Sequence, residues 1–364
     1  MLTIYIKPTN FCNIGCEHCY LPEDVRANKN RMSPAKLEEV ARFAKDMMER
    51  DGHKRLSVIW HGGEPMTLPP TYYRMAGEIF DNIIGYSNYR ESIQTSLIPY
   101  TKEWAELVKA RFNGVIGSSL DFSLRSIKGS SEDYINLWMK KVDLARQDRI
   151  TVIPGMVPTR LQLGKGSSII EWMVERQFYE FNIDRYSAIG STSSIERPSN
   201  LHHAKFMTEL FDACMKRIKN GLAAPKINVV TAAISGVLYG NPGDRWGTSC
   251  QRDFIVIEPD GSTNTCPDRA MHEKPYSNTG DGANQFASSK DRLKWIMIAD
   301  ITHKKSHCLN CEFRTWCKSG CPVTPNGRDE GENECSGYKS FLLHIGKFAE
   351  SEENLKLCEQ YLTG

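Results

Sequence analysis

The chain has 364 residues, with 46 basic and 44 acidic side chains and a net charge of +2. This near balance, without a concentrated basic patch, gives no indication of nucleic acid as the main partner. The length favours two domains, each large enough to bury a core.

The sequence predicts a cytoplasmic protein with no membrane partner. No run approaches the ~20 apolar residues that span a bilayer, and residues 1–8 lack the features of a signal peptide. Twelve cysteines in a reducing compartment indicate metal ligands rather than disulfides. Only Cys214 and Cys358 stand apart from two clusters, and both fall on apolar helical stripes, so we expect them in the core.

The first part of the chain alternates strands and helices. Residues 2–6 alternate as a strand, and Ser33 with Pro34 begins a helix that has one apolar face. Residues 56–60 form the next strand, so the order strand, helix, strand implies a parallel sheet. Further strands are predicted at 91–96, 115–120, 151–157 and 180–186, and helices at 101–111, 131–147, 167–177 and 201–219.

Six βα units are visible, fewer than the eight of a closed barrel. We therefore predict an α/β fold, a TIM-like partial (β/α)6 barrel over residues 1–220. Residues 221–248 are rich in Gly and Pro and are expected to bridge to a cysteine-rich domain at 249–345, followed by a helical tail at 346–364. Chemistry in such a fold lies at the C-terminal ends of the strands.

The loop after the first strand carries Cys12, Cys16 and Cys19, with Tyr20 behind them. Three thiolates without a fourth suit an iron–sulfur cluster that keeps one iron free of protein ligand. The alternatives are a zinc site completed by His18, whose spacing is wrong for a finger or ribbon, and disulfides, which the compartment disfavours.

This C-x3-C-x2-C pattern followed by an aromatic residue resembles the radical S-adenosylmethionine (SAM) enzymes, whose fold is also a partial barrel. The resemblance implies that Cys12, Cys16 and Cys19 bind a four-iron four-sulfur cluster and that its open iron is chelated by SAM. The resemblance also implies that Tyr20 contributes to SAM binding. The cofactor would carry the radical chemistry, and the protein would orient it.

Two further motifs resemble SAM-binding segments of that family. Gly62, Gly63 and Glu64, followed by Pro65, resemble the motif that meets the SAM amino group, a charge-assisted contact. The alternative is an ordinary turn.

Ser119 and Asp121 belong to a stretch that resembles the one after the fourth strand in the family, which implies contact with the SAM carboxylate or ribose. Gln94 stands where relatives often carry the same residue. Strand-end capping is the alternative for all three side chains.

Seven cysteines lie between residues 250 and 335 and form the second group of cysteines in the sequence. A zinc ribbon is the alternative, but the spacing resembles the SPASM extension of peptide-modifying radical SAM enzymes. The resemblance implies two auxiliary iron–sulfur clusters. One would be held by Cys308, Cys311, Cys317 and Cys335, and the other by Cys250, Cys266 and Cys321.

The second of these sets lacks a fourth cysteine, so its cluster is expected to be open or capped by another ligand. Asp268, two residues after Cys266, is the candidate ligand or catalytic base. The alternative is a solvated carboxylate or one paired with Arg269.

The resemblance implies an enzyme that modifies a ribosomally synthesised precursor peptide, using SAM, three four-iron four-sulfur clusters and an electron donor such as flavodoxin or ferredoxin. The stretches 317–322 and 334–339 look most like maturases of XYE-type peptides, which join an aromatic ring carbon to a β-carbon in a three-residue cyclophane. Thioether formation, formylglycine formation in a sulfatase, and a non-catalytic scaffold are the alternatives. With few residues before Cys12, leader binding is expected to use the barrel, the bridge or a separate protein.

Overall fold

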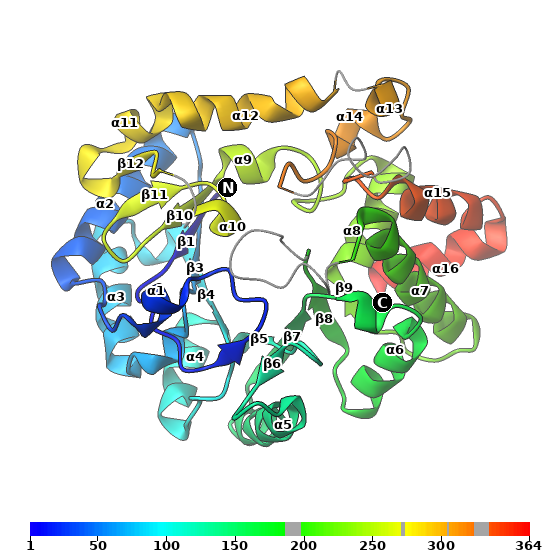
Figure 1. Ribbon diagram of the computed structural model, residues 1–364, viewed down its shortest axis with the longest axis horizontal. Coiled ribbons are helices and arrows are strands. Elements are labelled where there is room, and N and C mark those ends of the chain that lie inside the picture. The colour runs from blue at the N-terminus through cyan, green and yellow to red at the C-terminus, as the bar shows by residue number, and fades with distance from the viewer. Residues whose placement is uncertain (186–197, 271–273, 304–305, 324–334) are drawn as a thin grey trace. The chain divides into compact units, whose positions relative to one another are not determined.

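The computed structural model describes the chain except for residues 186–197, 271–273, 304–305 and 324–334 (Figure 1). Its residues form two compact units. The first contains Met1–Ile153 and Cys250–Ile296, and the second contains residues 154–185, 198–249 and 297–364, as far as they are described. Within these ranges, no helix combines the length and apolar composition needed to cross a bilayer.

The sheet of the first unit has the order β12-β11-β10-β1-β3-β4-β5. The strands from β10 to β5 run parallel, while β11 and β12 are antiparallel additions. Their bounds are β1 (Leu2–Ile6), β3 (Leu56–Trp60), β4 (Tyr89–Thr95), β5 (Val115–Ser119), β10 (Phe254–Ile257), β11 (Ser262–Asn264) and β12 (Ser277–Asn278).

Helices follow the parallel strands, and α2, α3 and α4 lie together beside the sheet of the first unit (Figure 1). Ser33 Oγ accepts the Lys36 N–H at the start of α2, and Gly52 ends it in a left-handed conformation. The helices are α1 (Glu23–Ala27), α2 (Pro34–Asp51), α3 (Pro70–Ile83), α4 (Ala105–Arg111) and α5 (Ser131–Gln147). Later in the chain come α9 (Ser249–Arg252), α10 (Pro267–Ala270), α11 (Ala283–Ser288) and α12 (Lys290–His303).

Strand β10 ties the chain after Cys250 to the first unit. It pairs in parallel with β1, from Thr3 opposite Phe254 onward. At the end of this pair, the fully buried Lys7 places Nζ 2.5 Å from Oε1 of Glu258. The compact units therefore divide the chain differently from the predicted boundaries, because residues 250–296 group with the first strands rather than with the later cysteines.

The second unit is mainly helical. Strand β8 (Glu180–Ile183) pairs in parallel with the end of β7 (Thr151–Met156) and with β9 (Lys226–Ile227). Helices α7, α8, α15 and α16 pack against one another (Figure 1). The helices are α6 (Gly166–Glu175), α7 (Asn200–Lys219), α8 (Asn228–Tyr239), α13 (Ser306–Leu309), α14 (Arg314–Cys317), α15 (Lys339–Phe348) and α16 (Glu352–Thr363).

Most predicted elements are confirmed within two or three residues, although residue 186 of the last predicted strand lies outside the described residues. The core position of Cys214 and Cys358 is also confirmed, since both are fully buried. Helix α8 was not expected inside the bridge. The apolar face of α8 is buried. A glycine stands at position 236 of this helix, where a β-carbon would lie 3.1 Å from the Trp316 ring.

Candidate active site

The three cysteines of the first loop lie close together at the C-terminal end of β1. The Cys12 N–H bonds the Arg26 carbonyl, and the Cys19 N–H bonds the Cys16 carbonyl. Burial raises the pKa of Cys12 to about 12, with further contributions from Glu64 and from the other two thiols. The three thiols are therefore close enough for their charges to interact, and their binding of one cluster remains a prediction.

Arg125 connects this loop to the end of β5. Strand β2 (Gly15–Cys16) pairs with β6 (Arg125–Ser126), so that Cys16 lies opposite Arg125. The Arg125 guanidinium donates from Nη1 to Cys16 Sγ at 3.2 Å and from Nε to Asp121 Oδ2 at 2.6 Å. His18 Nε2 lies 3.3 Å from the same carboxylate oxygen. The predicted residue Asp121 is thus buried beside the cysteine loop.

The two glycines after β3 are required by the close approach of the cysteine loop. The Gly63 N–H bonds the Thr9 carbonyl at 3.0 Å. A β-carbon on Gly63 would lie closer than 3.0 Å to the carbonyl oxygens of Asn10 and Phe11. Gly62 has a φ of 118°, and a β-carbon there would meet the Thr9 carbonyl. These glycines therefore hold the loop against the end of the strand.

Glu64 is almost fully buried, and its carboxylate accepts three hydrogen bonds. Oε1 accepts from the Met66 N–H at 2.9 Å and from the Thr95 hydroxyl at 2.5 Å, while Oε2 accepts from the Ser96 N–H at 2.8 Å. Its side chain joins the ends of β3 and β4. The contact with the SAM amino group predicted for this residue remains a prediction.

Gln94 and Ser119 meet at the ends of neighbouring strands. Gln94 Nε2 donates to Ser119 Oγ at 3.2 Å, and the Ser119 carbonyl accepts from the Tyr134 hydroxyl at 2.8 Å. Two polar side chains that the motifs single out, Gln94 and Ser119, are therefore in contact, and Ser119 lies two residues before Asp121.

Tyr20 follows Cys19 and is influenced by the charges of both Cys19 and Asp268. Burial raises the pKa of Tyr20 well above its usual value, and the charges of Glu258, Cys19 and Asp268 raise it further. Lys7 Nζ lies 5.0 Å from the centre of the Tyr20 ring. The Asp268 carboxylate is therefore within electrostatic range of the loop that carries the three cysteines.

Cys317 lies near two other cysteines of the predicted auxiliary set, Cys311 and Cys335. Burial raises the pKa of Cys317 to about 12, and the Cys335 and Cys311 thiols add to this shift. A β-carbon at Gly337 would collide with Cys317 Sγ and lie 3.6 Å from Cys335 Sγ. The Cys311 N–H bonds the Cys308 carbonyl at 3.2 Å. This part of the predicted ligand set is thus brought together.

The other predicted set is distributed over both units. Cys250 in α9 and Cys266 before α10 belong to the first unit, and Cys321 to the second. Their assignment to one cluster, with Asp268 as ligand or base, remains a prediction. The Arg269 side chain and Glu334 lie outside what the structure describes.

The donor chemistry fits iron–sulfur clusters at both described thiol groups. Soft thiolates are the usual ligands of such clusters. The glycines at 62 and 63 let the cysteine loop approach the end of β3, and the glycine at 337 leaves space beside Cys317 Sγ. Within the described ranges, no three His, Cys, Asp or Glu side chains converge as ligands of a single metal ion. Cys12, Cys16 and Cys19 would hold the first cluster, and Cys308, Cys311, Cys317 and Cys335 an auxiliary one.

The sequence motifs did not indicate that Arg125 contacts the cysteine loop. They did not single out Arg185 either, which lies over the Tyr338 ring. The only available signal for Arg125 was its place four residues after Asp121. The pairing of β2 with β6 that brings it to Cys16 is tertiary.

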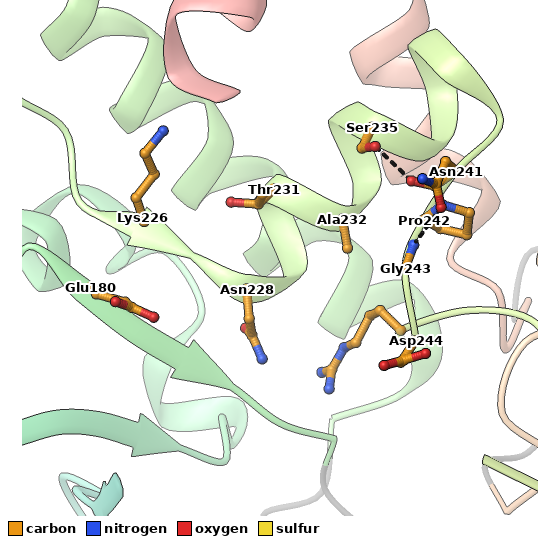
Figure 2. Close-up of a pocket in the computed structure, with 11 residues that line it drawn as sticks. Glu180, Lys226, Asn228, Thr231, Ala232, Ser235, Asn241, Pro242, Gly243 and Asp244 are labelled. Carbon is orange, nitrogen blue, oxygen red and sulfur yellow. Dashed lines mark hydrogen bonds between the residues drawn. The ribbon is translucent and has the colours of Figure 1, made fainter. Parts of the chain in front are cut away.

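The second unit also contains an open groove of about 690 Å³ (Figure 2). Figure 2 shows Asn228, Thr231 and Ser235 projecting from α8, with the Ser235 hydroxyl bonded to the Asn241 carbonyl. Its lining residues are Glu180, Lys226, Asn228, Thr231, Ala232, Ser235, Asn241, Pro242, Gly243, Asp244 and Arg245. They include two acids and two bases, so the groove favours neither ligand charge, and none is a cysteine.

Known proteins resemble this chain in sequence. Residues 6–156 match the family model of the Radical SAM superfamily. The chain is 34% identical over 352 residues to an uncharacterised protein of Archaeoglobus fulgidus, and this alignment covers 88% of this chain and 74% of the relative. It is 21% identical over 356 residues to a serine-type anaerobic sulfatase-maturating enzyme of Klebsiella aerogenes, covering 94% and 84%.

Two solved structures share the fold. Native anSMEcpe with bound AdoMet has a TM-score of 0.78 at 19% identity, covering 99% of this chain and 100% of the other. Streptococcus suis SuiB bound to precursor peptide SuiA has a TM-score of 0.62 at 17% identity, covering 88% and 72%. With the matched family model and the three thiols at the end of β1, these likenesses show that the chain is an enzyme of the radical SAM superfamily, with the mixed α/β fold of the SPASM-type maturases.

Proposed function

We propose that this enzyme modifies a ribosomally synthesised precursor peptide by joining an aromatic ring carbon to a side-chain β-carbon two residues away. The observation that carries the proposal is the presence of two separate thiol groups, one around Cys16 and one around Cys317. A carbon–carbon bond made from two C–H bonds removes two electrons, so a second redox centre is useful. The stretch from Cys317 to Pro322, which resembles XYE-type maturases, narrows the product to a three-residue cyclophane.

When bound, SAM and its cluster supply a 5′-deoxyadenosyl radical that takes a hydrogen atom from the peptide. Cys12, Cys16 and Cys19 would hold the cluster, and Glu64 would orient the SAM amino group. Ser119 and Asp121 would lie near its carboxylate or ribose. The Arg125 guanidinium supports this role for Asp121, because its Nε donates to that carboxylate and holds it in place.

Asp268 is proposed to accept the proton that leaves the substrate carbon. Its charge reaches Tyr20 beside the SAM loop, which supports a position near the reacting carbon. Cys250, Cys266 and Cys321 would hold the nearer auxiliary cluster and the other four cysteines the outer one, making three four-iron four-sulfur clusters. We place the enzyme in the cytoplasm, where a flavodoxin or ferredoxin would donate electrons.

The peptide substrate is supported by the likeness to SuiB, whose solved structure contains its precursor peptide SuiA. The alternative of formylglycine formation in a sulfatase is favoured by the likeness to the Klebsiella maturase. Against it, residues 251–257 contain no cysteine where the resembling sulfatase-maturating enzymes carry one. Thioether formation is the remaining alternative within the same chemistry.

Co-expression with a neighbouring precursor gene, followed by mass spectrometry, tests the proposal. We expect the peptide to lose two hydrogens and to keep that loss after its thiols are alkylated, with fragmentation blocked across three residues. A protected thiol would favour the thioether instead. A new aldehyde at a cysteine or serine would favour the sulfatase reaction.

A further inference from the structure

Three side chains form a stack near the cysteines of the second unit, and two of them, His203 and Tyr338, are buried. The His203 and Tyr338 rings lie 5.0 Å apart with an interplanar angle of 18°. The Arg185 guanidinium lies 4.8 Å from the centre of the Tyr338 ring. His203 comes from α7, Tyr338 precedes α15, and Arg185 follows β8, so three separate segments build the stack.

Tyr338 connects this stack to the thiols. Its N–H donates to the Cys335 carbonyl at 2.9 Å, and its backbone is left-handed with a φ of 59°. The preceding Gly337 lies directly against Cys317 Sγ, and its carbonyl accepts from Trp246 Nε1 at 3.1 Å.

Arg185 is the charged member of the stack. Burial lowers the pKa of His203 to about 3, helped by the charges of Arg185 and Arg245, so this imidazole is neutral near pH 7. Arg245 is occupied elsewhere, because Nη1 donates to Asp184 at 3.1 Å and Nη2 to the Ile183 carbonyl at 2.5 Å. Neutral His203 therefore supports the Tyr338 ring, and the ring supports the Arg185 guanidinium.

We propose that Arg185 sets the reduction potential of the cluster held by Cys308, Cys311, Cys317 and Cys335, and that Tyr338 and His203 are positioning residues for it. Reduction adds negative charge to a cluster, and a nearby cation in a buried site stabilises the reduced form. Arg185 therefore raises the potential and makes this cluster a better electron acceptor. The inference rests on the proposed function, in which these cysteines hold a cluster.

Potentiometric titration of the anaerobically reconstituted full chain, followed by electron paramagnetic resonance, tests this inference. The signal that is lost in Cys317→Ala identifies the cluster. We expect Arg185→Gln to lower its midpoint potential by an amount equal to roughly a tenfold change in the reduction equilibrium, about 59 mV for one electron. Arg185→Lys keeps the charge and is expected to retain most of the potential.

Arg176→Gln is the matched control, because Arg176 also lies over an aromatic ring, that of Trp172 at 4.3 Å, in the same unit. It should leave the potential unchanged.

Tyr338→Leu removes the ring under the guanidinium and should lower the midpoint potential as Arg185→Gln does. If Arg185→Gln does not take up iron, the potential of Tyr338→Leu tests the inference in its place.

An unshifted signal in a loaded Arg185→Gln or Tyr338→Leu protein would overturn the inference while leaving the cluster assignment intact. If Cys317→Ala loses neither iron nor a signal, the cluster assignment itself fails. The two failures are therefore distinguishable by iron content and by spectrum.

Discussion

Arg125 places Nη1 at 3.2 Å from Sγ of Cys16, so a guanidinium donates directly to one of the three thiols proposed to hold the SAM cluster. The same side chain is paired with the buried Asp121 carboxylate, and only 17% of it is exposed. Removing one partner of a pair buried to this degree leaves the other charge without compensation.

Arg125→Gln is therefore expected to lower the free energy of unfolding by about 3 kcal/mol. Urea denaturation of iron-free protein under reducing conditions measures this, with Arg176→Gln as a control on a more exposed arginine of the second unit. A loss no larger than that of the control would show that the Asp121 contact does not stabilise the loop.

Gly63→Ala tests whether the cysteine loop must lie against the end of β3. The added methyl would meet two backbone carbonyls of the loop, and overpacking of this kind costs about 1–3 kcal/mol. We expect the variant to bind less iron after anaerobic reconstitution, because the loop has to move. Gly346→Ala is the matched control, since its added methyl has only Val237 nearby at 3.8 Å. Equal iron content in both variants would contradict the prediction.

Stability should fall in mild acid because of His203. Its folded pKa is about 3, below the unfolded value near 6.5. As the pH falls, the unfolded chain therefore binds a proton at this residue before the folded chain does. The stabilisation that comes from keeping His203 neutral is complete above pH 6.5 and is lost as the pH falls toward 3. Between pH 7.5 and 5.5 the free energy of unfolding of the natural chain should fall by about 1 kcal/mol more than that of His203→Phe, a variant that keeps the ring stack. Equal losses in urea titrations at the two pH values would contradict this.

Asp268→Asn separates the proposed base from cofactor cleavage. A general base contributes about 10²–10⁴-fold to a rate, so crosslinked peptide should fall by at least that lower factor. SAM cleavage without product should continue, because the variant leaves Cys12, Cys16 and Cys19 unchanged. Quantifying 5′-deoxyadenosine and modified peptide in one reaction checks this. Undiminished product would exclude Asp268 as the base.

The sequence predicted those elements whose signals are local. The helix at 131–147 and the strand at 56–60 have clear periodicity and are found within the same bounds. Helix α8 escaped prediction because Gly236 and Gly240 read as turn residues, whereas Gly236 makes room for the Trp316 ring. The addition of β10 to β1 also escaped, since chain order does not give strand order.

The candidate site divides in the same way. Cys12, Cys16 and Cys19 are near one another in the chain, so their grouping was readable from spacing. The contact of Arg125 with Cys16 depends on β2 pairing with β6, more than a hundred residues away. The position of Arg185 over the Tyr338 ring likewise depends on the packing of separate segments. Such contacts leave no periodic or spacing signal.

The most direct test of the account is the amount of 5′-deoxyadenosine formed when anaerobically reconstituted protein receives SAM and a strong reductant. The natural chain should contain iron and form this product, whereas Cys16→Ala should form none because one ligand of the SAM cluster is missing. A natural chain that contains zinc in place of iron and forms no 5′-deoxyadenosine, or a Cys16→Ala variant that still forms it, would contradict the assignment of this loop.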